Sequence, residues 1–229
     1  MLFFNAFGNN DMKGISSDKA HKEFLRLLLS GNRAACSAYA HDYYRQHNSI
    51  QDLYENLLKK ALYEVGRLWE FNKISVAAEH LASAIVEAIL NEFYPEIVSR
   101  EKGDKTVILT CIEQEMHQIG IKMVGDVFER QGWNTYFLGA NTPTKELIDY
   151  TKLIQPHLLG VSLSIYFHLP ALEAMLQSIR REFFVMPVLV GGQAFRHGGR
   201  EFLERYEQVF YKPDLNSVES FIENFEQYG

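Results

Sequence analysis

The spacing of apolar residues changes once along this 229-residue chain, and that change limits the folds it can adopt. Up to about residue 99, apolar residues recur every three or four positions, as in amphipathic helices. From about residue 105, short runs rich in β-branched residues alternate with helical segments, as in a parallel sheet covered by helices. The sequence therefore predicts an α/β protein whose first part is entirely helical.

The helical part is expected to form a four-helix bundle. A glycine and an asparagine at 31–32 close the first helix, and Pro95 ends the last one. Short connections between successive helices favour a bundle. The expected helices cover residues 17–30, 33–46, 49 to the break at 71–72, and 75–94. Residues 1–16 are expected to be a flexible arm.

The second part is expected to be a Rossmann-like, doubly wound parallel sheet. The expected strands are 106–112, 133–138, 158–164, 187–190 and 209–211. The expected helices are 116–130, 145–153, 170–182, 200–206 and 217–227. A polar, glycine-containing linker covers 99–105, so the predicted division is an arm at 1–16, a helical-bundle cap at 17–99 and an α/β domain at 105–229.

Charge and cysteine content exclude several classes of function. The chain has 23 Lys and Arg against 29 Asp and Glu, a net charge of −6, so binding to nucleic acid through phosphate contacts is not expected. Cys36 and Cys111 lie in no zinc-binding spacing. No apolar run is long enough to cross a bilayer, and no signal peptide is recognised. A cytoplasmic protein without a membrane partner is expected.

One motif directly follows the first predicted strand, where open α/β sheets bind their ligands. It reads Glu115-x-His117-x-x-Gly120. The carboxylate can accept one ring N–H of His117, which leaves the other nitrogen for a metal. Gly120 is expected to allow close packing of the backbone where the helix begins. Taken alone, such a motif is more often an exposed loop histidine.

Small residues end two later strands. Ser162 and Ser164 end the third, and Gly191 and Gly192 end the fourth. They are expected to leave a slot between sheet and helix, with hydroxyl groups that can bond a polar ligand. A Gly-Gly pair is usually only a turn, but three such signals in this order are less expected by chance.

Residues 105–229 resemble the cobalamin-binding domain of the methionine synthase and corrinoid-protein type. The resemblance implies that His117 is the lower cobalt ligand and that Glu115 is its hydrogen-bond partner. The residues implied to hold the nucleotide tail of the cofactor are Gly120, Ser162, Ser164, Gly191 and Gly192. The chain departs from the family pattern in having Glu115 where the family has aspartate.

The helical part carries a W-x9-E-H pattern, formed by Trp69, Glu79 and His80, with Val76 on the face of His80. Taken alone, this is more often a core tryptophan and a solvated Glu-His pair. Before a cobalamin-like domain, it resembles light-responsive cobalamin sensors of the CarH type. The resemblance implies adenosylcobalamin between the two domains. Trp69 and Val76 would pack on its adenosyl group, and Glu79 and His80 would make polar contacts.

The same resemblance implies a signalling protein rather than an enzyme. Light would break the Co–C bond and change conformation or oligomeric state. Transcriptional members begin with a helix-turn-helix domain and carry a histidine and an arginine where this chain has Glu70 and Met116. A stand-alone sensor without direct DNA binding is therefore expected. Its output would be a partner protein or, as favoured here, a light-dependent homo-oligomer. The contact would be made through the bundle surface or through the arm, which carries phenylalanines at positions 3, 4 and 7.

Other interpretations remain open at this stage. The chain could instead be a corrinoid protein that carries a methyl group for a methyltransferase, or a haem-binding sensor on the same scaffold. A cobalamin-dependent mutase would need a catalytic barrel larger than this chain. Aromatic residues of the bundle could line a site for a bilin such as biliverdin, as in photocobilins, although a core role is favoured. These residues are Tyr39, Tyr43, Tyr44, Tyr54, Tyr63 and Phe71.

Overall fold

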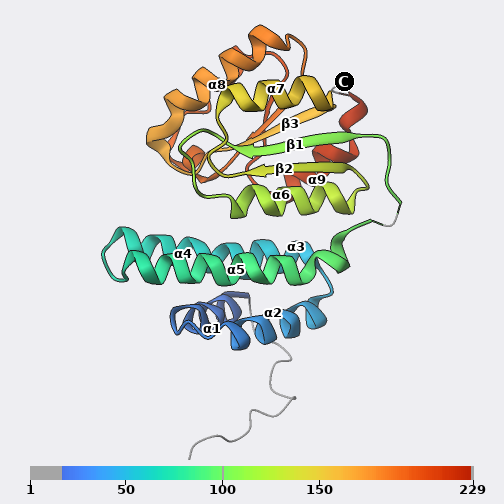
Figure 1. Cartoon of the computed structure of the whole chain (residues 1–229). Helices are drawn as coiled ribbons and strands as arrows, with labels where there is room; N and C mark the ends of the chain where they lie inside the picture. Colours follow the sequence, from blue (N-terminus) through green and yellow to red (C-terminus); the bar gives the residue numbers. More distant parts are fainter. Residues whose placement is uncertain (1–16, 100, 228–229) are drawn as a thin grey trace, which may run out of the picture. The chain divides into compact units, whose positions relative to one another are not determined.

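The computed structural model describes residues 17–99 and 101–227 (Figure 1). The phenylalanines of the arm lie outside these residues. The chain divides into two compact units between Ile89 and Leu90. This division falls inside a long helix, α5 (Val76–Ile97). Within the described part of the chain, no helix is both long and apolar enough to span a membrane.

The first unit is helical, as predicted. It contains α1 (Ser17–Leu29), α2 (Arg33–His47), α3 (Ile50–Asp52), α4 (Lys59–Glu70) and the first part of α5. α1 packs against both α2 and α4. The core side chains include Phe24, Leu28, Cys36, Ala40, Leu53, Tyr54, Leu57, Leu58, Ala61 and Val65. Recurrence of apolar residues at three- and four-residue spacings places them on one face of each helix.

Capping residues mark the helix ends in this unit. Gly31 adopts a φ of 69°, a left-handed conformation that glycine accepts without strain. Asn32, which was expected to help close α1, instead caps α2: its side chain accepts a hydrogen bond from the Ala35 N–H. Ser49 accepts a hydrogen bond from the Asp52 N–H, which accounts for the start of the third helix.

A π-helical segment, Leu53–Leu58, interrupts the third helix between α3 and α4. The wider turn was not predicted, because its apolar residues keep the ordinary helical spacing. Tyr43 donates a hydrogen bond to Asp52 Oδ2 (2.6 Å) beside this segment, and burial is the main cause of a raised Tyr43 pKa. Tyr43 and Tyr54 are buried, so the favoured core role holds for these two rings.

α5 continues past Pro95, where the sequence predicted its end. A proline removes one backbone hydrogen bond from a helix. The last turn nevertheless persists, because the Val98 N–H donates to the Tyr94 carbonyl (3.1 Å) and Ile97 is buried. The free energy gained by burying one large apolar side chain is comparable to the free energy lost with the missing hydrogen bond.

The second unit is a parallel sheet with the strand order β2-β1-β3-β4-β5, which confirms the predicted fold class. Figure 1 shows α7 and α8 on one face of this sheet and α6 and α9 on the other. The strands are β1 (Thr106–Cys111), β2 (Asn134–Gly139), β3 (Leu158–Ser162), β4 (Val188–Gly191) and β5 (Val209–Tyr211). The helices are α6 (Ile119–Arg130), α7 (Thr144–Ile154), α8 (Leu169–Glu182) and α9 (Leu215–Glu223).

The largest differences from the predicted helices of this unit lie in three segments. α6 begins at Ile119 rather than at 116, because residues 113–118 form a loop. The segment 200–206 contains only a 3₁₀ turn, Leu203–Arg205. The last helix starts two residues earlier than predicted, where Asp214 and Ser217 form a capping box, and is followed by the 3₁₀ turn Phe225–Gln227.

Candidate functional site

The loop that follows β1 holds His117 against a buried carboxylate. Glu115 is 0% exposed, whereas the His117 side chain is 48% exposed. Oε1 of Glu115 contacts Nδ1 of the His117 ring and accepts a hydrogen bond from the His117 backbone N–H (3.1 Å). The contact expected from the two-residue spacing is therefore present, with glutamate in place of aspartate.

The second oxygen of Glu115 binds the loop that follows β3. Oε2 accepts hydrogen bonds from the backbone N–H groups of Ser164 (2.9 Å) and Ile165 (3.0 Å). The two loops are neighbours because β1 and β3 pair in parallel, with Cys111 opposite Ser162. Glu115 thus links the histidine loop to the next strand of the sheet.

These hydrogen bonds keep Glu115 ionised. Burial by itself raises the pKa of this carboxyl group, but hydrogen bonds from the His117 ring and from the N–H groups of Ser164, His117 and Ile165 outweigh it. The resulting pKa is about 2. An ionised acceptor at Nδ1 favours the tautomer that carries its proton there, so Nε2 is the unprotonated ring nitrogen. His117 can therefore offer a single nitrogen to a metal.

The loop after β2 also supports this arrangement, which the sequence did not predict. Asn141 accepts a hydrogen bond from the Gln114 N–H (2.8 Å) and donates its own N–H to the Glu115 carbonyl (2.8 Å). Gln118 Oε1 accepts from the Ala140 N–H (3.1 Å). Polar residues in a loop are common, so no sequence pattern could have identified these partners.

The small residues at the ends of β3 and β4 lie together. Ser162 is buried and pairs in register with Gly191. The Leu163 N–H donates to the Gly191 carbonyl (3.0 Å). A Cβ atom on Gly192 would lie 2.0 Å from the Leu163 carbonyl oxygen, so the backbones touch at this corner. Ser164 contributes its backbone N–H to Glu115, a role that the prediction did not include.

Gly120 does not have the expected packing role. No described atom outside its own helix lies within 4 Å of the position that its Cβ would occupy. The first turn of α6 is therefore open at this point, and the chain itself does not require glycine there.

The four candidate residues of the helical unit lie at the ends of α4 and α5. Trp69 is 47% exposed at the end of α4, so it is not the core tryptophan of the simpler interpretation. Val76 and the His80 side chain are exposed on the first turns of α5. Glu79 accepts a hydrogen bond from Ser83 Oγ (2.8 Å), and its carboxylate lies 3.6 Å from His80 Nε2.

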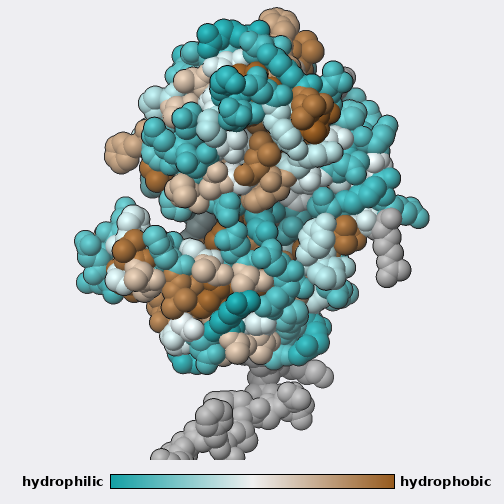
Figure 2. Space-filling model, viewed as in Figure 1, coloured by the Kyte–Doolittle hydropathy of each residue, from teal (hydrophilic) through white to brown (hydrophobic). Residues whose placement is uncertain are grey.

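Further apolar side chains are exposed in the same unit. They are Phe71, two residues after Trp69, and Leu81, directly after His80. Figure 2 shows apolar side chains, coloured brown, on the surface of the helical unit. An exposed aromatic and apolar surface of this kind is typical of a binding site.

Low pH is expected to destabilise the cofactor-free protein through Glu115. Its folded pKa of about 2 lies below the value of about 4.3 for an unfolded chain. The stabilisation is therefore complete above about pH 4.3 and is lost as the pH falls toward 2. Its size is about 3 kcal/mol. Urea unfolding between pH 7 and pH 2.5 measures this loss in the wild type, and Glu115→Gln should reduce it. An equal pH dependence in both proteins would contradict the assignment.

Comparison with protein families identifies both units. The B12 binding domain family matches residues 105–214, and a second family of the same description matches residues 20–93. The chain contains two B12-binding domains. The corrin ring of B12 provides most of the ligands of its cobalt, so a single protein nitrogen such as Nε2 of His117 would suit this cofactor.

Two kinds of curated protein resemble these B12-binding domains. The transcriptional repressors CarA and CarH of Myxococcus xanthus are 29% identical over 132 residues and 26% identical over 145 residues. These matches cover 58% and 62% of this chain but less than half of each repressor, 44% and 48%. Dimethylamine corrinoid protein 1 of Methanosarcina mazei is 20% identical over 181 residues, which is 77% of this chain and 83% of that protein.

Solved structures share the fold. The monomethylamine corrinoid protein of Methanosarcina barkeri matches with a TM-score of 0.78 and 12% identity, over 92% of this chain and 100% of that one. A chain of the methanol:cobalamin methyltransferase complex of the same organism matches with a TM-score of 0.51 and 15% identity, over 95% and 87%. At these identities the comparison establishes the architecture alone.

Proposed function

We propose that this chain binds adenosylcobalamin and acts as a light sensor, with His117 as the lower ligand of cobalt. The observation that carries the proposal is the His117 ring, which a buried, ionised Glu115 holds through Nδ1 while its side chain is half exposed. The bound cofactor supplies a cobalt–carbon bond that light can break. The protein would hold the metal through Nε2, and Glu115 would fix the ring tautomer that presents this nitrogen and raise its basicity.

The slot residues would bind the nucleotide tail of the cofactor. Ser162, Ser164, Gly191 and Gly192 lie at adjacent strand ends, and Gly120 leaves the first turn of α6 open. Hydroxyl groups bond the polar parts of a tail, and glycines let it approach the backbone.

The helical unit would bind the adenosyl group. Trp69 and Val76 offer exposed apolar surface, and Glu79 and His80 offer polar groups. Light changes the conformational equilibrium only if these side chains interact differently with the dark and the illuminated forms. We propose that the change alters a homo-oligomer or a contact with a partner protein, without a catalytic step in this chain. Size-exclusion chromatography before and after illumination tests for this light-dependent change of assembly. Identical elution profiles would count against light sensing.

A bilin remains a prediction for this chain. The absorption spectrum of the purified protein separates a bilin, cobalamin and haem. Tyr43 and Tyr54 are core residues, so any bilin would contact the other bundle aromatics.

Trp69→Ala is expected to weaken binding of adenosylcobalamin about tenfold and to leave binding of hydroxocobalamin nearly unchanged. The loss corresponds to about 1.4 kcal/mol, within the range for burial of a large aromatic surface against a ligand. Titrations with both cobalamins measure the ratio. Phe71→Ala is the matched control, because it removes another exposed aromatic side chain near the same helix end. Equal losses for both cobalamins would show that Trp69 does not recognise the adenosyl group.

A methyl carrier is the second candidate function. It is favoured by the dimethylamine corrinoid protein, whose similarity extends over both units of this chain. A carrier would bind methylcobalamin at least as tightly as adenosylcobalamin, and illumination of the adenosylcobalamin complex would leave its size unchanged. Tighter binding of adenosylcobalamin, with a light-dependent change of size, would support the sensor instead.

A further inference from the structure

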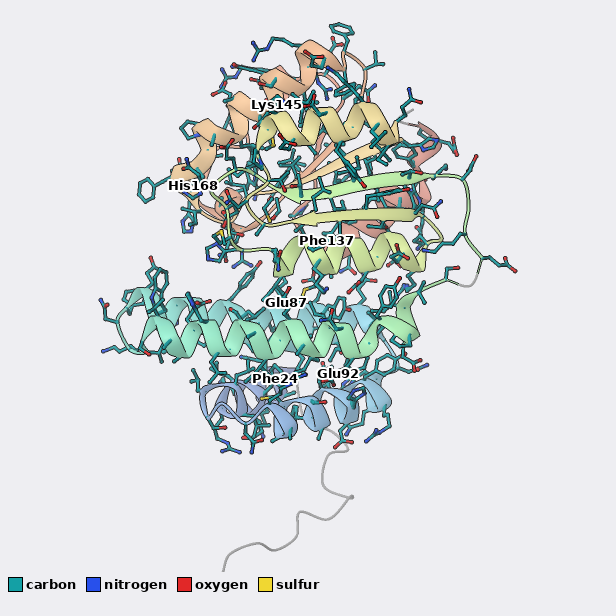
Figure 3. The ribbon with its side chains drawn as sticks, in the orientation of Figure 1. Phe24, Glu87, Glu92, Phe137, Lys145 and His168 are labelled. Carbon is teal, nitrogen blue, oxygen red and sulfur yellow. The ribbon has the colours of Figure 1, made fainter. Side chains whose placement is uncertain are left out.

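His168 is a second histidine beside Glu115, and the site described above does not use it. It ends the 3₁₀ turn Tyr166–His168, which follows β3. Figure 3 labels it on the side of the sheet where the strands end. Its Nδ1 atom is buried, lies 3.9 Å from Glu115 Oε2, and has no hydrogen-bond partner among the described residues. A buried polar atom without a partner is costly and calls for an explanation.

The position of the His168 Nδ1 atom next to Glu115 provides this explanation. The Ser164 and Ile165 N–H groups and the His168 ring all face the same oxygen of Glu115, and all come from the segment after β3. The other oxygen faces His117. The segment 164–168 therefore determines how the carboxylate is turned, and the carboxylate determines how the His117 ring is turned.

A distance of 3.9 Å is too long for a hydrogen bond but within the range of an electrostatic contact with a carboxylate. A proton on Nδ1 would point toward a full negative charge in a buried, low-dielectric surrounding. A small rotation of the ring shortens the contact to a charge-assisted hydrogen bond. The preferred tautomer of His168 is therefore the one with its proton on Nδ1.

We propose that His168 is a positioning residue for His117 and acts through Glu115. Its Nδ1–H attracts Oε2 and fixes the carboxylate, so that Oε1 holds the His117 ring in one orientation. This inference rests on the proposed function only for its effect on cobalamin. The interaction between the two histidines is a property of the cofactor-free protein and can be measured there.

Four variants separate this role from simple packing. His168→Phe keeps a ring but removes both nitrogens. His168→Asn places an amide nitrogen where Nδ1 lies, and His168→Gln places one where Nε2 lies. His197→Phe is the matched control, since its ring also packs against the 3₁₀ turn, 6.3 Å from the Tyr166 ring, while no contact joins it to Glu115 among the described residues.

The first measurement is the ¹⁵N and ¹H NMR spectrum of histidine-labelled, cofactor-free protein. The Nδ1–H signal of His117 should move in His168→Phe, return toward the wild-type position in His168→Asn, and stay in place in His197→Phe. If the phenylalanine variant does not fold, the asparagine and glutamine variants still decide. The proposal is supported if the His117 signal in His168→Asn lies closer to its wild-type position than in His168→Gln. It is overturned if the His117 signal is identical in these two variants. It is also overturned if the signal does not move in His168→Phe.

The second measurement is cobalamin binding, followed by absorbance. His168→Phe should bind about tenfold more weakly than the wild type, as is common when a residue that orients a metal ligand is lost. His168→Asn should recover most of this affinity. If the wild type binds no cobalamin, the proposed function fails while the NMR result still decides the role of His168. Wild-type affinity in His168→Phe would overturn the effect on the cofactor.

Discussion

His117→Ala is expected to lower the affinity for cobalamin by at least about a hundredfold and to change the absorption spectrum of what remains bound. The variant removes the nitrogen that would bind cobalt, and even the loss of a residue that only supports a metal ligand commonly costs 10- to 100-fold. Titration of the purified protein with cobalamin, followed by absorbance, measures both effects.

His157→Ala is the matched control for this experiment. His157 directly precedes β3, and its Nδ1 accepts a hydrogen bond from the Thr106 N–H at the start of β1, the opposite end of that strand from His117. This variant should keep the wild-type spectrum and affinity. An unchanged spectrum and affinity in His117→Ala would remove His117 from the cobalt site.

Gly192→Ala is expected to destabilise the protein by about 4 kcal/mol. Gly192 has φ 116° and ψ 162°, a conformation that is essentially restricted to glycine and costs other residues about 1–3 kcal/mol. In addition, the new Cβ would lie 2.0 Å from the Leu163 carbonyl oxygen. This oxygen belongs to the backbone, so a side-chain rotation cannot relieve the overlap.

Gly120→Ala is the natural comparison, because no described atom outside its own helix lies within 4 Å of its Cβ position. Alanine is a better helix former than glycine, so this variant should be unchanged or more stable by up to about 1 kcal/mol. Urea unfolding of both variants at pH 7 tests the pair. If Gly192→Ala were as stable as Gly120→Ala, the backbone at 191–192 could shift to accommodate the new Cβ. That result would contradict the tight contact between Gly192 and the Leu163 carbonyl oxygen.

The contrast between these two glycines also bears on the cofactor. Gly192 is required by contacts within the chain, whereas the chain leaves Gly120 open. If Gly120→Ala weakens cobalamin binding without a loss of stability, the glycine is needed for the ligand. This is the outcome that the proposed tail-binding slot predicts.

Helices and strands could be predicted from the sequence because their signals are local. The spacing of apolar residues and the residues at helix ends act over a few positions, and they located the bundle and the alternating strands. The failures have tertiary causes. α5 passes Pro95 because Ile97 is buried, and α6 starts late because the loops after β1 and β2 are joined by hydrogen bonds.

The candidate site divides in the same way. The pairing of Glu115 with His117 followed from a two-residue spacing, which brings the side chains together in a loop. The sequence by itself thus determined the fold class and the pairing of a carboxylate with a histidine in the candidate site. Only the tertiary structure decided which groups hold Glu115: the N–H groups of Ser164 and Ile165 and, at a longer distance, the ring of His168. These groups lie about fifty residues away along the chain and meet Glu115 because β3 pairs beside β1, an adjacency set by long-range packing of the sheet.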